Sequence, residues 1–419
     1  MYYRLIEKPT MKILENLIPK ETLSVKNIKS EYILNIFHNA FFCEGNWLLY
    51  YLTIVSYRTV GYIDAISIGL GLLLEIPTGA IADLIGRKKT VVFASLFISL
   101  GIYIQGFALD QWALLIGNLF FFTGMSFYSG ANDALTYDSF KDENKTEMYE
   151  DFVFRSKITT TASYIVAVLI GGYVYQFNPR LPFIIWGSTH FLGFLTSLTL
   201  SEPKVEHYAF SFKNYITQNI QGFRELFKPD LRKFIFFIFS ILGISYIFEW
   251  GLLKPSIGIS FGFGAIEMSY LFTIEAIISA FIYYNFKSIR KKSGDYLGLV
   301  LLNFILILCF FLFSQEIGFW GAIPMLLISM VGSLANPWLV IIINKYTRSE
   351  YRATTLSTVA MILKIPYVLT IGYIGNLIDD GFLRGTLLSM AIVLLIIAVI
   401  ETAITVGLKS KHKKITNGQ

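Results

Sequence analysis

Residues 79–89 read Gly79-Ala80-Ile81-Ala82-Asp83-Leu84-Ile85-Gly86-Arg87-Lys88-Lys89 and stand between two long apolar runs. An acidic residue lies one turn beyond the first glycine, and the second glycine is followed directly by three cations. The apolar sequence then resumes at Thr90. This pattern predicts a short polar turn between two membrane-spanning helices, with its cations on the cytoplasmic side.

The composition of the 419 residues also favours a lipid bilayer. Hydrophobic residues make up 54% of the chain, charged residues only 15%, and the mean hydropathy is +0.58. A chain with so few charges has more apolar surface than a water-soluble fold buries. Cys43 and Cys309 both lie in apolar runs, so we expect no structural disulfide. The first 30 residues lack a continuous apolar core, so we expect no signal peptide.

Twelve apolar runs are long enough, at about 20 residues, to cross the hydrocarbon core. They lie near residues 32–56, 61–82, 90–109, 112–136, 158–177, 182–200, 234–253, 262–286, 296–314, 317–343, 354–377 and 385–408. The sequence therefore predicts an all-α membrane protein with 12 transmembrane helices.

Lysine and arginine are distributed unevenly over this topology. Thirty of the 35 fall in segments on one side, and Lys364 lies within a span. The other side holds four: Arg58, Arg180, Lys254 and Arg384. The positive-inside rule then predicts a multi-pass protein of the cytoplasmic (plasma) membrane with both termini in the cytoplasm. Because topology accounts for the basic charge, we expect no nucleic-acid partner.

Short sequences recur at nearly one offset. Arg87-Lys88-Lys89 recurs 203 residues later as Arg290-Lys291-Lys292, and Ala131-Asn132 recurs 204 residues later as Ala335-Asn336. These repeats keep register with the span count and predict two pseudo-symmetric six-helix halves, an arrangement that permits alternating access to a midplane site. The expected divisions are a cytoplasmic N-terminal segment (1–31), an N-terminal six-helix half (32–200), a cytoplasmic central loop (201–233), a C-terminal six-helix half (234–408) and a cytoplasmic tail (409–419).

The spacing Gly79-x3-Asp83-x2-Gly86-Arg87-Lys88 resembles the signature loop of the major facilitator superfamily. Glu75-Ile76-Pro77-Thr78 before it, and Ser129-Gly130-Ala131-Asn132-Asp133-Ala134-Leu135-x-Tyr137-Asp138 further on, resemble a bacterial branch of that family. The resemblance covers nearly the whole chain after residue 30. It implies the 6+6 helical fold and a secondary transporter.

The residues of this loop are candidates for coupling and gating. Gly86 permits the turn, and Asp83 is expected to accept hydrogen bonds from a helix N-terminus, which by the resemblance belongs to span 11. Arg87 is expected to pair with Asp138. The predicted gating set is Glu75, Gly79, Asp83, Gly86, Arg87, Lys88 and Asp138. The alternative is that the cations only anchor the topology.

Charges inside the spans form a second group of candidates, because a charge in the bilayer is costly and usually functional. The predicted substrate and proton site consists of Glu44, Glu275, Lys364, Glu249, Trp250 and Trp338. Alternatively, Lys364 is only a counter-ion of Glu44 or Glu275. Asp64 is expected to be solvated at an outer helix end, and His38 and His190 to be packed, hydrogen-bonded residues.

Signatures of other chemistry are missing from the sequence. It has no phosphate-binding loop, no metal-ligand spacing and no nucleophile elbow. We therefore expect a protein that is not an enzyme and has no cofactor or metal.

The predicted function is that of a secondary active transporter for a small organic solute, acting by proton-coupled export (antiport) of a cationic or amphipathic compound. The alternatives are proton-coupled uptake of a small metabolite, with Lys364 as an anion anchor, or a sensor that kept the fold. The expected partners are the solute, protons and the lipid bilayer, and the expected state is a monomer.

Overall fold

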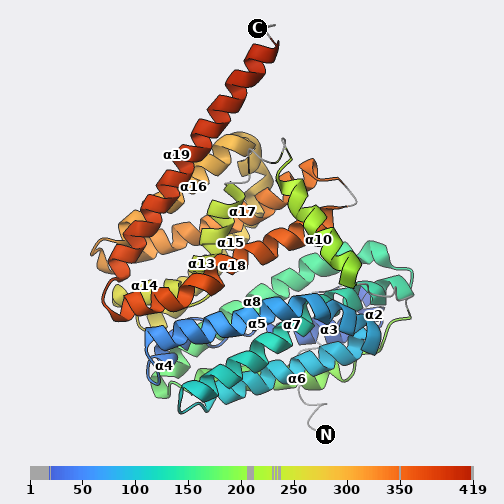
Figure 1. Cartoon of the computed structure of the whole chain (residues 1–419). Helices are drawn as coiled ribbons and strands as arrows, with labels where there is room; N and C mark the ends of the chain where they lie inside the picture. Colours follow the sequence, from blue (N-terminus) through green and yellow to red (C-terminus); the bar gives the residue numbers. More distant parts are fainter. Residues whose placement is uncertain are drawn as a thin grey trace. The chain divides into compact units, whose positions relative to one another are not determined.

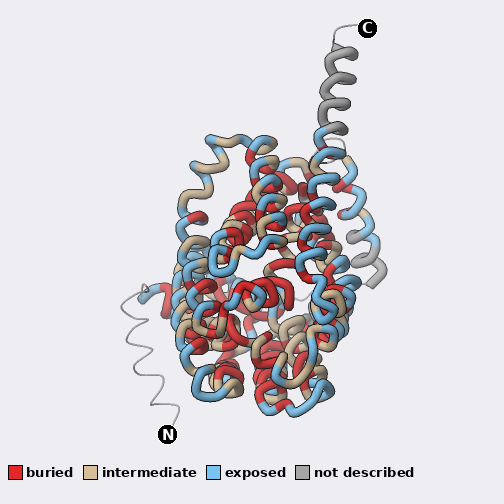
Figure 2. The backbone as a smooth tube through the Cα atoms, turned by 90° about the vertical axis from the view of Figure 1, so that its left-hand side faces the viewer, coloured by how far each residue is buried: buried red, intermediate tan, exposed pale blue. Residues whose placement is uncertain are grey.

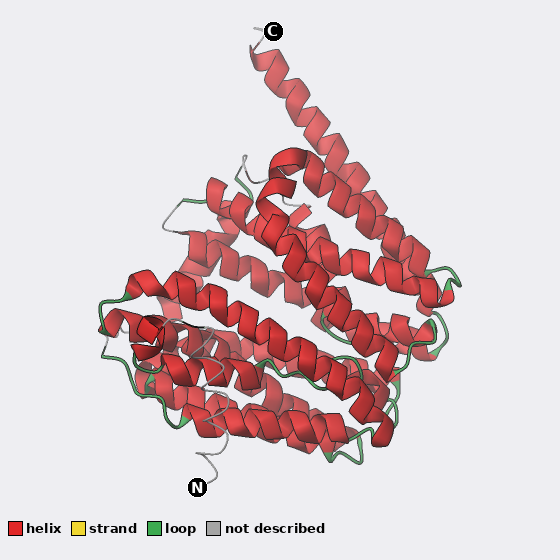
Figure 3. Cartoon of the chain, turned by 180° about the vertical axis from the view of Figure 1, so that it is seen from behind, coloured by secondary structure: helices red, strands yellow, loops and turns green. Residues whose placement is uncertain are grey.

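The computed structural model describes residues 18, 20–204, 212–228, 231, 234, 237–348 and 351–416. Within these ranges the regular structure is helical and contains no strand, as Figure 3 shows. In the signature stretch, the side chains of residues 76–81 and 83 fall outside the description.

The chain divides into two compact units. Unit 1 comprises Met1–Val55, Ile66–Phe210 and Ala265–Phe272, and unit 2 comprises Ser56–Ala65, Ser211–Gly264 and Thr273–Gln419. The boundary after Phe210 falls within the predicted central loop. Two helices, α5 (Tyr57–Ile85) and α15 (Ala265–Ser293), contribute residues to both units, which the sequence did not predict.

Apart from the first turns of α15, unit 1 is built from helices that lie before residue 200. They are α2 (Lys20–Ser24), α3 (Ile28–His38), α4 (Trp47–Tyr51), most of α5, α6 (Arg87–Gly106), α7 (Gln111–Asp142), the 3-10 turn η1 (Thr146–Met148), α8 (Tyr149–Phe177) and α9 (Leu181–Ser197). Helices α6 and α7 run side by side (Figure 1). Their backbones can approach closely because Gly101 has no side chain. A Cβ at this position would lie only 2.5 Å from the backbone nitrogen of Phe121.

Unit 2 contains the remaining helices. They are α10 (Phe212–Leu226), the π-helix η2 (Ile238–Leu242), α13 (Gly243–Glu249), α14 (Leu253–Ser260), most of α15, α16 (Asp295–Phe313), the 3-10 turn η3 (Gly318–Gly321), α17 (Ala322–Tyr346), α18 (Arg352–Asp379) and α19 (Leu383–Thr416). Figure 2 marks the buried residues along the helices. Part of the unit 2 core is aromatic, since the rings of Phe248 and Phe313 stack 5.6 Å apart and both contact Phe310.

Eight helices of the described chain are long and apolar enough to cross a membrane. They run over Arg87–Gly106, Gln111–Asp142, Thr146–Phe177, Ala265–Ser293, Asp295–Phe313, Gly318–Tyr346, Thr354–Asp379 and Leu383–Thr402. Two predicted spans are not continuous helices. The first, 32–56, is α3 and α4 separated by the turns of residues 39–46, and the seventh, 234–253, is interrupted after Glu249. The apolar runs do not show these breaks, because apolar residues continue on both sides of each one and even within it, as in Ala40–Cys43.

The repeated basic triplets occupy different places. Arg87, Lys88 and Lys89 are the first residues of α6, whereas Arg290–Lys292 lie in the last turn of α15. A glycine with a positive φ precedes or follows each triplet: Gly86 (φ 99°) opens α6 and Gly294 (φ 69°) opens α16. The two junctions therefore share a glycine turn, but the cations stand on opposite sides of it.

Candidate functional site

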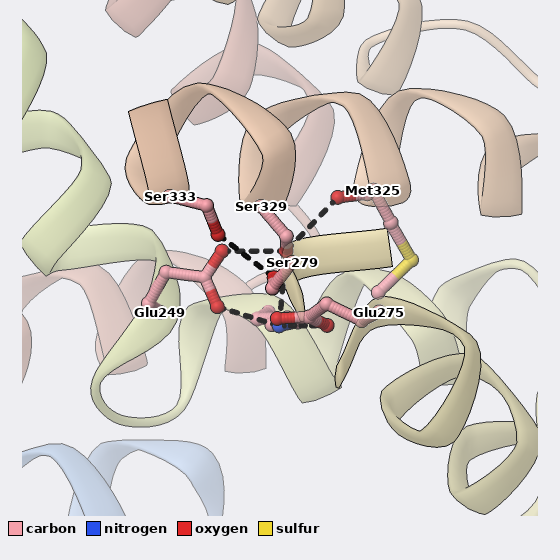
Figure 4. Close-up of polar contacts among 7 residues, drawn as sticks. Glu249, Glu275, Ser279, Met325, Ser329 and Ser333 are labelled. Atoms are coloured by element: carbon pink, nitrogen blue, oxygen red, sulfur yellow. Dashed lines mark hydrogen bonds and ion pairs between the residues drawn. The ribbon is translucent and has the colours of Figure 1, made fainter. Parts of the chain in front are cut away.

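A buried ion cluster lies in unit 2, centred on Lys254 of α14. This side chain is only 1% exposed, and its Nζ lies 2.6 Å from Glu249 Oε2 and 2.6 Å from Glu275 Oε2. In Figure 4, the carboxylates of Glu249 and Glu275 converge on the same point from separate helices. Two carboxylates around one ammonium leave the cluster with a formal charge of −1.

A hydroxyl group of α17 completes the cluster. Ser329 Oγ donates to Glu249 Oε1 at 2.7 Å and accepts from Lys254 Nζ at 3.3 Å. One turn further along α17, Ser333 shares a 2.8 Å hydrogen bond with Ser279 of α15 (Figure 4). The facing surfaces of α15 and α17 are therefore polar beside the ions. Serine hydroxyls commonly hydrogen-bond between packed membrane helices, whereas buried ionisable side chains such as Lys254 mark a functional region.

The break between α13 and α14 brings the ions together. In a continuous helix, residues five apart point about 140° away from each other, yet Glu249 and Lys254 form an ion pair across this break. Trp250 is extended, with φ −104° and ψ 103°, and Gly251 has φ 115°. Discontinuous membrane helices commonly form transporter binding sites, since unwound backbone and helix ends bind ions and charged groups.

Tyr367 of α18 holds this break in place. A Cβ at Gly251 would lie 1.6 Å from Tyr367 Oη, so only glycine fits there. Tyr367 is fully buried and donates to Asp64 Oδ2 at 2.8 Å. Asp64 was expected to be solvated, and that prediction is wrong: it is 5% exposed and belongs to the part of α5 that packs in unit 2. The break is thus joined to the first turns of α5 through one hydroxyl group.

Two predicted site residues, Glu249 and Glu275, come together in this cluster. Their cation in this cluster is Lys254, which was expected on the outer side of the membrane. Lys364 lies half-buried on α18. Glu44 lies half-buried in the turns between α3 and α4, in unit 1. A signal for Lys254 was present in the sequence, because Gly251 between Glu249 and Lys254 is suited to breaking a helix.

The two predicted tryptophans have different surroundings. Trp250 follows Glu249 directly, stacks on Tyr246 and is 61% exposed. Trp338 is 1% exposed, and its indole N–H donates at 2.9 Å to Asp295, the partner of Arg290. Trp338 therefore anchors the start of α16 and is not a member of the ion cluster.

The signature loop contains one predicted contact and one unexpected one. Arg87 forms an ion pair with Asp138, as expected, and also donates to Ala134 O at 2.9 Å. The exposed Glu202 was not predicted: its carboxylate accepts from the backbone N–H groups of Arg87 and Lys88 at 2.7 and 2.9 Å. A carboxylate at a helix N-terminus satisfies free donors and favours the helix dipole.

The remaining gating candidates all lie on α5. Glu75 is half-buried there. Gly79 and Asp83 lie in the same helix, but their side-chain surroundings are outside the described residues. The helix N-terminus that Asp83 was expected to cap stays a prediction.

We expect Glu202→Ala to destabilise the start of α6 by about 1 kcal/mol, the usual cost of losing an N-cap acceptor. Thermal unfolding of the purified protein should show this loss, and hydrogen exchange should show faster exchange at Arg87 and Lys88. Glu147→Ala, at another exposed glutamate of unit 1, is the matched control. Unchanged exchange at both amides would show that Glu202 does not stabilise the helix.

The apolar helices define a multi-pass membrane protein, and its family and structural neighbours make it a transporter rather than an enzyme. The sequence matches the Major Facilitator Superfamily over residues 27–371, and the chain belongs to this family. No protein of curated function matches the sequence at a significant level.

Solved transporter structures share the fold. A point mutant of the nucleoside transporter NupG superposes with a TM-score of 0.75 at 16% identity, covering 90% of this chain and 99% of that one. A POT family transporter in complex with 5-aminolevulinic acid has a TM-score of 0.69 at 12% identity, with 90% and 95% covered. A bacterial homologue of the human lysosomal transporter Spinster has a TM-score of 0.66 at 14% identity, with 88% and 94% covered. At these identities the likeness concerns the fold alone.

Proposed function

We propose that the chain exports a small cationic or amphipathic organic compound across the cytoplasmic membrane in exchange for protons. The observation that carries this proposal is the cluster of one buried ammonium between two carboxylates at a helix break. Its formal charge of −1 is suited to one additional positive charge, which either a proton or a cationic solute supplies.

The exchange follows from competition for that charge. When a proton neutralises Glu275, Lys254 pairs with Glu249 alone and the cluster is electrically balanced. When the proton leaves, Glu275 pairs with Lys254 as in the structure, and the cluster regains the negative charge that attracts a cationic group of the solute. Because one site binds one or the other, proton movement in one direction drives solute movement in the opposite direction, and alternating access delivers the site to each side.

Glu44 is proposed as the corresponding group of unit 1. It stands 205 residues before Glu249, close to the offsets of the sequence repeats, and both residues adjoin a helix break. Lys364, Trp250 and the gating residues of the signature loop remain proposed parts of the transport cycle. The proposed arrangement is a monomer with 12 spans and both termini in the cytoplasm.

The experiment is transport by purified protein in liposomes with an imposed pH gradient. Pools of lipophilic cations and of small metabolite anions are tested separately for accumulation, with empty liposomes as the control. We expect accumulation of a cation on the acidic side. Glu44→Gln should reduce this accumulation while exchange without a gradient continues, since an amide carries no proton. Accumulation of an anion with the proton gradient would instead support uptake of a metabolite.

A further inference from the structure

Helix α3 carries a polar face inside unit 1 that the proposed transport site does not use. Glu31, Asn35 and His38 are spaced by four and three residues and therefore share one side of the helix. The ring of His38 stacks on Tyr128 of α7 with centroids 4.3 Å apart and lies 4.8 Å from the ring of His190 in α9. This row of polar side chains packs against α7, α8 and α9, and Asn35 donates to Ser156 of α8 at 3.4 Å.

Glu31 lacks a donor for its carboxylate among the described residues. Its side chain is 0% exposed, and neither carboxylate oxygen has a hydrogen-bond partner there. Asn132 and Thr136 face it from α7, but the hydroxyl of Thr136 donates to the backbone oxygen of Asn132 at 2.9 Å. Asn132 Oδ1 is also buried without a donor from the described chain. Three acceptor oxygens without a hydrogen-bond partner among the described residues are thus buried on the facing helices α3 and α7.

The charges near Glu31 add to this imbalance. The titratable groups that face it are Asp133 and Tyr128, both on α7, and neither is a cation. No ion pair to Glu31 occurs in the described part of the chain. An ionised carboxylate buried without a partner is costly by several kcal/mol, and such a group takes up a proton instead.

His38 extends the same pattern along the helix. It is 6% exposed, and its Nε2 is buried with no hydrogen-bond partner in the described ranges. A Cβ at Gly193 would lie 3.1 Å from this nitrogen, so the glycine leaves just enough room for the imidazole. The expectation that His38 is a hydrogen-bonded packing residue is therefore wrong at this nitrogen.

We propose that Glu31 is a proton-binding site of unit 1, holding a proton that its carboxyl group donates to Asn132 Oδ1. An ionised carboxylate only accepts hydrogen bonds, whereas the protonated carboxyl group of Glu31 has an O–H that donates. One proton thus gives a hydrogen bond to one carboxyl oxygen of Glu31 and to Asn132 Oδ1, two of the three oxygens that lack a partner among the described residues. The inference concerns the protonation of one residue and is tested without a transported solute, so it stands even if the proposed export fails.

The test is infrared difference spectroscopy of the purified protein in liposomes near neutral pH. Wild type should show the carbonyl stretching band of a protonated carboxylic acid, and Glu31→Gln should lose that contribution. Glu150→Gln, at an exposed glutamate of α8, is the control and should keep the band. A spectrum of Glu31→Gln identical to wild type in this region would overturn the proposal.

Two further measurements keep the proposal testable. Asn132→Ala should keep the acid band but shift it, because the proton loses its acceptor; an unmoved band would overturn the pairing with Asn132 even if Glu31→Gln does not fold. Wild-type spectra recorded with and without Na⁺ should agree. A carboxylate band that responds to Na⁺, in place of the acid band, would assign the site to a metal cation and contradict proton binding.

Discussion

Lys254→Met should lower the stability of the folded protein more than any other single charge removal in unit 2. The substitution keeps the length of the side chain but leaves two carboxylates facing each other without a cation. Removing one partner of a buried ion pair costs about 3–5 kcal/mol. Because the side chains of Glu249 and Glu275 are 22% and 17% exposed, we expect the lower end of that range.

The measurement is thermal unfolding of the purified variants. Lys254→Met combined with Glu275→Gln should recover much of the loss, since it removes the repulsion as well as the ion pair. Lys287→Met, at an exposed lysine of α15, should behave as wild type. If Lys254→Met were as stable as Lys287→Met, the ion cluster would not be a stabilising feature of unit 2.

Gly251→Ala should have the second-largest effect, on the order of 3 kcal/mol. An alanine at φ 115° is strained, and its Cβ would overlap Tyr367 Oη. Gly262→Ala separates the two causes. Gly262 also has a positive φ, 88°, but nothing in the described chain lies within 4 Å of the Cβ position. The control should therefore cost only the backbone strain, about 1–2 kcal/mol.

Thermal unfolding also tests this prediction. Tyr367→Leu removes the overlapping atoms but also the donor to Asp64. In that background Gly251→Ala should therefore cost less than it does in the wild-type background. Equal losses for Gly251→Ala and Gly262→Ala would mean that the break relaxes freely and that Tyr367 does not hold it.

The sequence predicted those features that depend on neighbouring residues. Long apolar runs predicted the helices, and the glycine turn before Arg87 predicted a junction between two of them. The pair Arg87–Asp138 was also predicted, from the cation of the loop and the carboxylate at the foot of span 4. The helices and the turn each depend on one segment, whereas the pair Arg87–Asp138 joins two separate motifs.

The features that the sequence missed depend on contacts between distant segments. Asp64 accepts from Tyr367, 303 residues away, so nothing around Asp64 in the sequence shows that it is buried. Lys254 was placed on the outer side because it follows the predicted span 234–253, and on an unbroken helix it could not pair with Glu249. The break at Gly251 removes that exclusion. The ion-pair partner of a buried charge is therefore hard to predict from the sequence until the positions of the helix breaks are known.

In the proposed cycle, the cluster of Glu249, Lys254 and Glu275 couples the movement of protons to the movement of the solute. The most direct measurement compares wild type with Glu275→Gln in liposomes, using the compound that the wild type accumulates. Two quantities are recorded: accumulation driven by a pH gradient and exchange without a gradient. We predict that Glu275→Gln folds, loses accumulation and retains exchange. Accumulation by Glu275→Gln to the wild-type level would contradict the claim.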